Sequence, residues 1–155
     1  MEYNKNNPMT LPCRQIERNG RVAPLPAYQT DGAAAMDVHA FLDEPVTIQP
    51  GCRALIPTGL CYAVPQGYAM LLMARSGLSI KQGICLANSV GLIDSDYRGE
   101  VQVGLLNTSD VPFTVHDGDR IAQMLLTAVP AFALDLRDTL DDTARGAGGF
   151  GSTKV

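Results

Sequence analysis

The stretch "AMDVHAF", residues Ala35–Phe41, decides the fold class of this chain. Its apolar residues Met36, Val38 and Ala40 alternate with the polar residues Asp37 and His39. Strict alternation places successive side chains on opposite faces of an extended chain, which is the pattern of a half-buried strand and not of a helix. The stretch therefore predicts a β-strand.

Short β-rich runs recur on both sides of this segment. Turn residues such as Pro, Gly, Asn and Asp separate the runs. Strands repeated at about 8–12 residue spacing are typical of a β-sandwich, jelly roll or barrel. The sequence therefore predicts an all-β jelly-roll-like fold from the runs "VTIQP", "RALIPTGLCYAV", "YAMLLMA", "GICLA", "EVQVGLL", "FTV", "RIAQMLLTAV" and "FALDL".

The composition is that of an ordinary globular domain. With 155 residues, 46% of them hydrophobic, the chain is long enough for one sizeable core. A net charge of −4 without a basic stripe argues against nucleic-acid binding. No apolar run approaches the ~20 residues of a membrane span, and the first residues lack the apolar region of a signal peptide. We therefore expect a cytoplasmic protein without a nucleic-acid or membrane partner.

The four cysteines show no metal-site spacing. They stand at positions 13, 52, 61 and 85 with no CxxC pair. Zinc-finger ligands need closely spaced pairs, so the sequence predicts reduced and mostly buried thiols.

One segment has a helical character, "RSGLSIKQG" at Arg75–Gly83. Ser76 is a suitable N-cap, Lys81 suits the last turn, and Gly83 suits the position after the helix. A short helix entered through Arg-Ser-Gly would present free amides and a guanidinium to an anion. The alternative is a plain connection between strands with a surface arginine, and the spacing alone does not decide between them.

The densest polar cluster is "GLIDSDYRGE", Gly91–Glu100, at an expected hairpin. Its carboxylates fail the calcium-loop pattern, because Leu105 stands at the twelfth position where a carboxylate is required. Asp94 is then either a turn-forming residue or a general base, and both interpretations stay open on the local sequence.

The end of the chain is rich in glycine. "RGAGGFGSTKV", Arg145–Val155, satisfies GxGxxG, but a dinucleotide site also needs a preceding strand and a following helix. The few apolar residues from position 137 onward predict a flexible arm. Its aromatic Phe150 and its hydroxyl and guanidinium groups would suit a nucleotide, as would Arg75, Ser76 and Gln123 elsewhere.

Taken together, five stretches resemble the five motifs of the trimeric dUTPase family, in the family's order. They are spread from Ala33 almost to the C-terminus, so the resemblance extends over most of the chain. The five are "AAAMDVHA" (33–40), "RSGLSIKQGI" (75–84), "NSVGLIDSDYRGE" (88–100), "GDRIAQM" (118–124) and "RGAGGFGST" (145–153). The resemblance implies a β jelly-roll domain over residues 1–136 and a flexible arm over 137–155. It also implies a homotrimer with active sites at subunit interfaces.

The resemblance further implies hydrolysis of dUTP to dUMP and pyrophosphate with Mg²⁺, which lowers dUTP and supplies dUMP for thymidylate synthesis. The ion would be held mainly by the substrate phosphates, with Asp37 contacting it through water. Two other functions remain open at this point, a dCTP deaminase of the same fold and a non-catalytic nucleotide-binding trimer.

The same resemblance assigns roles to individual residues. Asp94 matches the catalytic acid that holds the attacking water, and Tyr97 the ring that packs against deoxyribose. Residues matching the uracil-reading hairpin are Asn88, Gly91, Leu92, Ile93 and Gln102. Residues matching the phosphate contacts are Arg75, Ser76, Gly77 and Gln123. Residues matching the closing arm are Arg145, Phe150, Ser152 and Thr153.

Overall fold

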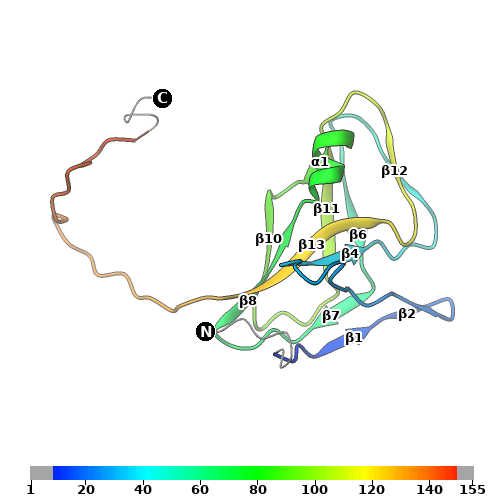
Figure 1. Ribbon diagram of the computed structural model, residues 1–155, viewed down its shortest axis with the longest axis horizontal. Coiled ribbons are helices and arrows are strands. Elements are labelled where there is room, and N and C mark those ends of the chain that lie inside the picture. The colour runs from blue at the N-terminus through cyan, green and yellow to red at the C-terminus, as the bar shows by residue number, and fades with distance from the viewer. Residues whose placement is uncertain (1–8, 150–155) are drawn as a thin grey trace.

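The computed structural model describes residues 9–149, and Figure 1 shows a β-barrel-like body with a long C-terminal arm. The body contains a single short helix among these residues. The elements are β1 (Cys13–Gln15), β2 (Glu17–Arg18), β3 (Arg21–Val22), β4 (Met36–His39), β5 (Val46–Ile48), β6 (Arg53–Pro57), β7 (Leu60–Tyr62), β8 (Tyr68–Met73), α1 (Ser76–Gln82), β9 (Ile84–Leu86), β10 (Val90–Ile93), β11 (Gln102–Asn107), β12 (Phe113–Val115) and β13 (Arg120–Ala128).

Two sheets form most of the body. One has the strand order β10-β8-β13-β4 and the other β6-β11-β9, and all of their pairings are antiparallel. Two-stranded pieces β1-β7, β12-β5 and β2-β3 complete the wall. Because the chain alternates between the two larger sheets from β8 to β11, the architecture is jelly-roll-like, as the strand pattern predicts. None of the described helices is long and apolar enough to cross a membrane.

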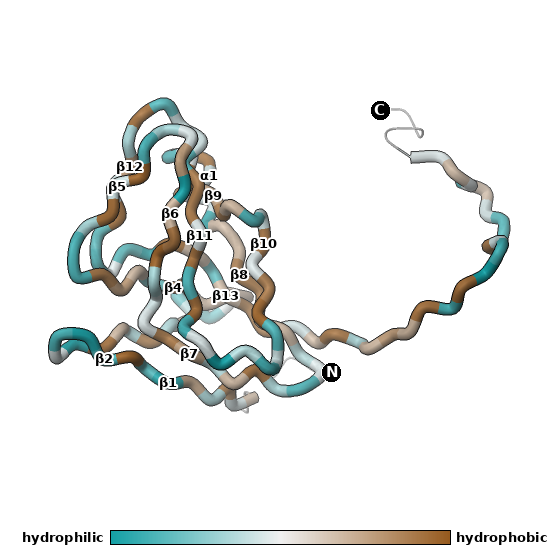
Figure 2. Tube along the Cα trace, turned by 180° about the vertical axis from the view of Figure 1, so that it is seen from behind, coloured by the Kyte–Doolittle hydropathy of each residue, from teal (hydrophilic) through white to brown (hydrophobic). Residues whose placement is uncertain are grey.

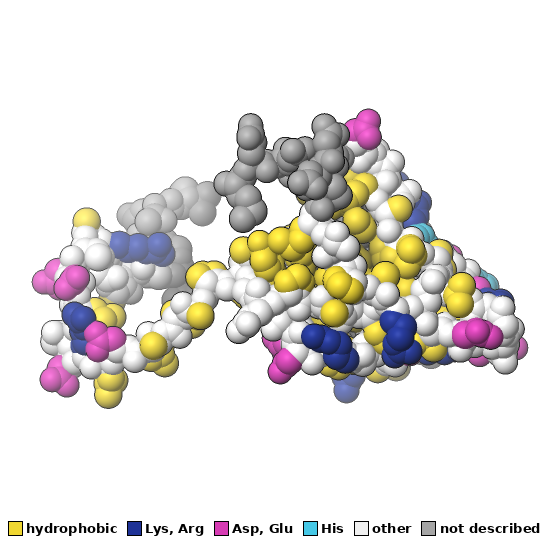
Figure 3. Space-filling view, turned by 90° about the horizontal axis from the view of Figure 1, so that it is seen from below, with side chains coloured by type: hydrophobic (Ala, Val, Ile, Leu, Met, Phe, Trp, Pro, Cys, Tyr) yellow, Lys and Arg dark blue, Asp and Glu magenta, His cyan; other side chains and the backbone are white. Residues whose placement is uncertain are grey.

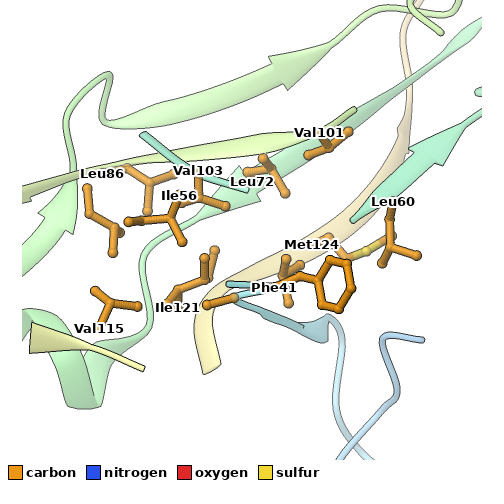
Figure 4. Packing of buried hydrophobic residues seen from close by; sticks show 14 of the residues in the cluster. Phe41, Ile56, Leu60, Leu72, Leu86, Val101, Val103, Val115, Ile121 and Met124 are labelled. Atoms are coloured by element: carbon orange, nitrogen blue, oxygen red, sulfur yellow. The ribbon is translucent and has the colours of Figure 1, made fainter. Parts of the chain in front are cut away.

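The core lies between the two larger sheets. Figure 4 shows aliphatic side chains from both sheets meeting around Phe41, Leu72 and Met124. Each fully buried side chain of this size contributes about 1.5–3 kcal/mol by leaving water. The strand predicted from residues 35–41 is confirmed at Met36–His39, and Val38 is buried in this core on strand β4. The half-buried pattern is not, because Asp37 on the other face is only 2% exposed.

Buried polar residues fall into two kinds. Asn107 is fully buried, and its amide donates to the carbonyls of Ile48 and Val111 at 2.9 and 2.8 Å. Thr58 donates to the carbonyl of Val101 at 2.6 Å. These two residues are held by backbone groups and stabilise turns. Asp37, only 2% exposed, is held by side chains instead, which singles it out.

The helix is confirmed at residues 76–82, but its expected cap is wrong. Arg75 occupies the N-cap position with an extended backbone, and no side chain caps the helix. Ser76 is the first helical residue. Gly83 ends the helix in the left-handed region at φ 68°, where its missing Cβ avoids strain, and Lys81 lies in the last turn.

The prediction of mostly buried cysteines is wrong. Only Cys61 is buried, whereas Cys13 and Cys52 are exposed and Cys85 is half-buried. Cys13 lies on the short strand β1, Cys52 in the turn before β6 and Cys85 on the edge strand β9, where side chains reach solvent. All four thiols are free.

The expected strand at "FALDL" is absent from the described residues. After β13 ends at Ala128, residues 130–149 run away from the body without a strand or helix. Figure 2 shows hydrophobic and hydrophilic residues interleaved along this arm. A strand needs a neighbour to pair with, and none of the described residues of this chain pairs with the segment.

Candidate active site

The first half of the candidate site is a cationic cluster around Asp37. Arg120 Nη1 lies 3.0 Å from Asp37 Oδ2, and Arg75 Nε lies 3.4 Å from Asp37 Oδ1. Gln123 Nε2 also reaches Oδ1 at 3.4 Å. We call Asp37, Arg75, Arg120 and Gln123 the cationic cluster. Two guanidinium groups against one carboxylate leave a net positive charge, which favours an anionic ligand.

A β-bulge assembles this cluster. Arg120 and Gln123 are three residues apart, and a regular strand would send their side chains to opposite faces. In β13 the register shifts between Arg120 and Ala122, so that Arg120 lies opposite His39 and Gln123 opposite Asp37. The bulge brings both side chains to Asp37, as bulges beside functional sites often do.

Arg120 is a functional candidate that the sequence analysis missed. It lies inside the matched motif "GDRIAQM", but its odd spacing from Gln123 gave no reason to group the two residues. Arg75 Nη1 also donates to the carbonyl of Arg120 at 2.9 Å, which ties the start of α1 to β13. Ser76 and Gly77 follow directly on α1 and are exposed.

His39 lies beside the cluster with a buried Nδ1 that has no hydrogen-bond partner among residues 9–149. Burial lowers the pKa of His39, Asp37 raises it, and Arg120 and Arg75 lower it further. The net direction is downward from the ordinary value. The imidazole is therefore held in its neutral form near pH 7.

The second half of the candidate site is an open pocket of about 450 Å³. It lies beside residues 94–101, and we call these residues the carboxylate loop. The pocket is lined by five residues that the sequence predicts for the site, Leu92, Ile93, Asp94, Tyr97 and Gln102. Three further residues line it, Leu55, Glu100 and Val101. Leu55 was missed because it is one apolar residue in an apolar strand, with no chemical signal in the sequence.

The carboxylate loop joins two sheets and is not a paired hairpin. β10 pairs with β8, whereas β11 pairs with β6 and β9. The expectation of a hairpin is therefore wrong in its pairing, because each strand uses its hydrogen bonds on a different neighbour. β10 is the edge strand of its sheet, so one row of its backbone groups is not paired in that sheet, and its residues Leu92 and Ile93 line the pocket together with Gln102. Such groups can read the donor and acceptor pattern of a flat ligand.

Asp94 is exposed, and its side chain makes no hydrogen bond or ion pair within the described part of the chain. Its backbone carbonyl accepts from the amide of Tyr97 at 3.3 Å, which forms the turn. Tyr97 is 44% exposed and its hydroxyl donates to the carbonyl of Glu100 at 2.9 Å. The loop therefore presents a free carboxylate beside a fixed aromatic ring.

Gly99 makes the position of this ring possible. A Cβ at Gly99 would lie 2.5 Å from the Tyr97 hydroxyl oxygen and 2.7 Å from Cζ. Only glycine allows such a close approach of backbone and ring without a shift.

Some predicted site residues lie apart from both half-sites. Asn88 is exposed in the turn before β10, and Gly91 packs on Leu72, so neither lines the pocket. Arg145 lies on the arm, where its Nε donates to the carbonyl of Gly148 at 2.8 Å. Phe150, Ser152 and Thr153 fall outside the described residues.

The two half-sites are far apart within one chain. Asp37, Gln123, Met73 and Val90 form one row across the four-stranded sheet, and Asp94 lies four residues further along than Val90. Three strand spacings and four residue rises separate Asp37 from Asp94 by about 19 Å. Within residues 9–149 no group of three or more His, Cys, Asp or Glu side chains could hold a metal ion.

The fold and site together define a jelly-roll-like β-barrel with a cationic cluster and a separate carboxylate loop. A family model described as dUTPase matches residues 21–154. The deoxyuridine 5'-triphosphate nucleotidohydrolase of Hahella chejuensis is 52% identical over 138 residues, which cover 88% of this chain and 91% of the relative. This chain belongs to the dUTPase family.

Solved structures agree with the fold. The dUTPase of Staphylococcus bacteriophage 80alpha, solved with dUPNHPP, superposes with a TM-score of 0.83 at 25% identity, over 94% of this chain and 99% of that one. A mutant dUTPase from phage phi11 of S. aureus, which coordinates a structural Mg(II) ion, has a TM-score of 0.73 at 24% identity. That match covers 84% of this chain and 98% of the other.

Proposed function

We propose that this protein hydrolyses dUTP to dUMP and pyrophosphate, which lowers dUTP and supplies dUMP for thymidylate synthesis. The observation that carries the proposal is the free carboxylate of Asp94 in an open pocket, in a chain that also holds a cationic cluster. Curated relatives that are about half identical over most of their length are named as dUTP nucleotidohydrolases.

Uracil and deoxyribose would bind at the carboxylate loop. The outer edge of β10 at Gly91–Ile93 and the start of β11 at Gln102 offer backbone groups to the base. Discrimination is strong where buried polar groups are left unpaired by the wrong ligand, as with cytosine at a uracil site. The ring of Tyr97 would pack against the sugar and exclude a 2′-hydroxyl. Asn88, which lies in the adjoining turn, would support this edge.

The triphosphate would bind at the cationic cluster. Arg75, Arg120 and Gln123 supply the donors, and Ser76 and Gly77 add exposed backbone amides at the start of α1. Asp37 orients the two arginines, because its two oxygens contact different guanidinium groups. Planar guanidinium groups suit phosphate oxygens, and a held guanidinium loses less freedom on binding.

In the chemical step, a water molecule attacks the α-phosphorus and the bond from that phosphorus to the bridging oxygen breaks. Pyrophosphate leaves with the bond electrons, and Asp94 accepts the proton of the water as general base. An exposed, unpartnered carboxylate has its lone pairs available for this role. Positioning of the water and neutralisation of charge on the phosphoryl oxygens supply most of the rate enhancement.

Mg²⁺ would enter with the substrate. Both oxygens of Asp37 already contact cationic groups, so this residue suits a contact through water better than direct ligation. A triphosphate supplies oxygen ligands of its own, and Mg²⁺ often keeps several waters at such sites. The bound ion would neutralise charge on the phosphates during the attack.

We further propose a homotrimer in which each active site combines residues from different chains. The separation of about 19 Å between Asp37 and Asp94 supports this, because one nucleotide cannot easily engage both within a chain. The outer face of the four-stranded sheet exposes Val90 and Leu92, and Figure 3 shows hydrophobic side chains gathered near the base of the arm. An apolar face of this kind is suited to a partner subunit.

The arm supports the same assembly. Phe132, Leu134 and Leu136 alternate with other residues and are each at least 85% exposed. An extended segment with one apolar face and no neighbour among residues 9–149 is suited to a sheet of another copy. We assign residues 1–136, including the extended segment 130–136 that would pair with another copy, to the jelly-roll domain and residues 137–155 to the closing part of the arm. In this assignment Arg145, Phe150, Ser152 and Thr153 close over a bound triphosphate and base.

The free thiols fit the reducing cytoplasm.

The test is release of pyrophosphate from dUTP, dCTP, dTTP and UTP by the purified protein. We expect hydrolysis of dUTP with at least ~100-fold preference over the other three nucleotides. Release of ammonia from dCTP would indicate a deaminase. Tight binding of dUTP without any pyrophosphate release would indicate a non-catalytic nucleotide-binding protein.

A further inference from the structure

We propose that the β2–β3 hairpin positions both half-sites through two arginines. Arg18 holds the carboxylate loop, and Arg21 holds the turn that precedes Arg120. The assignment of these elements to base and phosphate binding rests on the proposed function, but the mechanical role of the hairpin does not. Neither arginine belongs to the five motifs matched in the sequence.

The hairpin is a compact and rigid unit. Asn19 and Gly20 form its two-residue turn with φ values of 50° and 72°, and Arg18 lies opposite Arg21. Positive φ at both turn positions matches the twist of the flanking strands, which Asn-Gly favours. The two guanidinium groups lie 5.3 and 5.2 Å from the ring centroid of Phe41. The buried ring of Phe41 thus anchors both arginines to the core.

Arg18 continues to the carboxylate loop. Its Nη2 lies 2.5 Å from Glu100 Oε2, and its Nη1 donates to the carbonyl of Phe41. The other oxygen, Glu100 Oε1, accepts from the amide of Gly59 at 2.7 Å. The Tyr97 hydroxyl donates to the carbonyl of Glu100. These contacts therefore connect the buried ring of Phe41 to the ring of Tyr97 in the carboxylate loop.

Arg21 contacts the turn that leads to the cationic cluster. Its Nη1 lies 2.6 Å from Asp117 Oδ2, and its Nη2 lies 3.0 Å from Asp43 and donates to the carbonyl of Leu42. Asp117 Oδ1 accepts from the amide of Leu42 at 2.8 Å. The hydrogen bond from the Leu42 amide lowers the pKa of Asp117. Burial partly opposes this shift, and Arg21 lowers the pKa further, so the carboxylate stays ionised.

The turn held by Arg21 leads directly into the cationic cluster. The amide of Gly118 donates to the carbonyl of Ala40 at 2.9 Å, and the carbonyl of Asp119 accepts from the amide of Ala40 at 2.8 Å. Arg120 follows and contacts Asp37. The hairpin therefore contacts one residue adjoining each half-site, Glu100 on one side and Asp117 on the other.

The Arg21 contacts serve geometry more than stability, whereas Arg18 and Glu100 form a less exposed pair, with side chains 28% and 13% exposed. The side chains of Arg21 and Asp117 are 43% and 44% exposed, and exposed ion pairs contribute little to folding. Each guanidinium instead bridges two segments, Arg18 joining Phe41 to Glu100 and Arg21 joining Asp117 to Asp43, which restricts how each loop can move. Arg18→Gln and Arg21→Gln form a matched pair of variants, because each removes one of the two guanidinium groups that lie over the Phe41 ring.

Hydrogen exchange of the full-length protein tests the mechanical claim without any nucleotide. We expect Arg18→Gln to raise exchange about fivefold or more in residues 94–101, with residues 116–120 unchanged. Arg21→Gln should produce the reverse pattern. If both variants loosen both segments equally, or neither segment, the hairpin has no separate positioning roles. Glu100→Gln serves as a second variant on the Arg18 side if Arg18→Gln does not fold.

Kinetics then test the functional consequence. We expect Arg18→Gln to reduce the preference for dUTP over UTP by about tenfold, because the Tyr97 ring is less fixed. Arg21→Gln should raise KM for dUTP about fivefold and leave that preference unchanged. Arg18→Lys, which keeps the charge facing Glu100, should restore part of the preference. Equal losses of kcat/KM on every nucleotide in both variants would overturn this assignment, whereas an unaltered protein without dUTP hydrolysis would overturn the proposed function alone.

Discussion

Asp37 and Asp94 are two carboxylates of the same protein in opposite environments. Asp37 is 2% exposed and contacts Arg75, Arg120 and Gln123. Asp94 is exposed in an open pocket, and its side chain has no partner in residues 9–149. A carboxylate whose oxygens are occupied can organise its neighbours, whereas one with free lone pairs can accept a proton.

The difference separates positioning from chemistry. Residues around Asp37 are fixed before a ligand arrives, because each oxygen holds a different guanidinium. The carboxylate loop fixes Tyr97 and leaves Asp94 available. Substitutions at these two aspartates should therefore damage different properties of the protein.

The largest effect should come from Asp94→Asn. Loss of the general base lowers kcat for dUTP by about 10²–10⁴-fold, whereas the free energy of unfolding changes by less than about 0.5 kcal/mol at an exposed, unpartnered position. Pyrophosphate release and urea unfolding measure the two quantities. A large loss of stability would show that Asp94 is a structural turn residue.

Asp37→Asn should mainly lower the free energy of unfolding, in contrast to Asp94→Asn, which mainly lowers kcat. It leaves Arg75 and Arg120 facing each other without a full negative charge, and we expect a loss of about 2 kcal/mol in unfolding free energy. The loss stays below that of a fully buried pair, because the Arg120 side chain is 46% exposed. KM for dUTP should also rise. Unchanged stability would contradict the role of Asp37 as the organiser of the cluster.

Gly99→Ala tests whether the carboxylate loop fixes the position of the Tyr97 ring. The added methyl would meet the Tyr97 hydroxyl, so we expect the ring to move and the preference for dUTP over UTP to fall about tenfold. Stability should fall by only about 1 kcal/mol, since the loop is exposed. Kinetics with both nucleotides measure the preference, and Gly32→Ala is the control because a Cβ there meets no atom within 4 Å.

The smallest effect concerns His39, which faces Asp37, Arg75 and Arg120. The folded-state pKa lies below the ordinary value of 6.5, so the unfolded chain binds a proton more readily. Stability from this group is present above pH 6.5 and is lost as the pH falls through the folded-state pKa. Urea unfolding at pH 7.5 and pH 5.5, at fixed protein concentration, should show a smaller difference for His39→Gln than for the unaltered protein. An identical difference would place the acid sensitivity elsewhere.

Sequence patterns predict the strands of the body well, because alternation reports directly on burial. They do not predict the cluster at Asp37, since the bulge that turns Arg120 toward it is not visible in residue spacing. The β2–β3 hairpin was missed as well, although Asn19-Gly20 is a strong turn signal that could have located it.

The remaining differences arise where structure depends on distant partners. "FALDL" has the pattern of a strand, but residues 132–136 have no neighbouring strand within the part of the chain that the structure describes. The residues of the carboxylate loop follow from the family resemblance, whereas the separation of β10 and β11 into two sheets depends on competing pairings across the whole barrel.

The central claim is that one active site combines Asp94 of one chain with the cationic cluster of another. Co-expression of Asp94→Asn and Arg75→Gln subunits, each inactive alone, tests it most directly. Random mixing should restore about a quarter of the native dUTP hydrolysis, because a quarter of the shared sites receive both intact residues. No recovery in mixed oligomers of confirmed composition would contradict the claim and place each active site within a single chain.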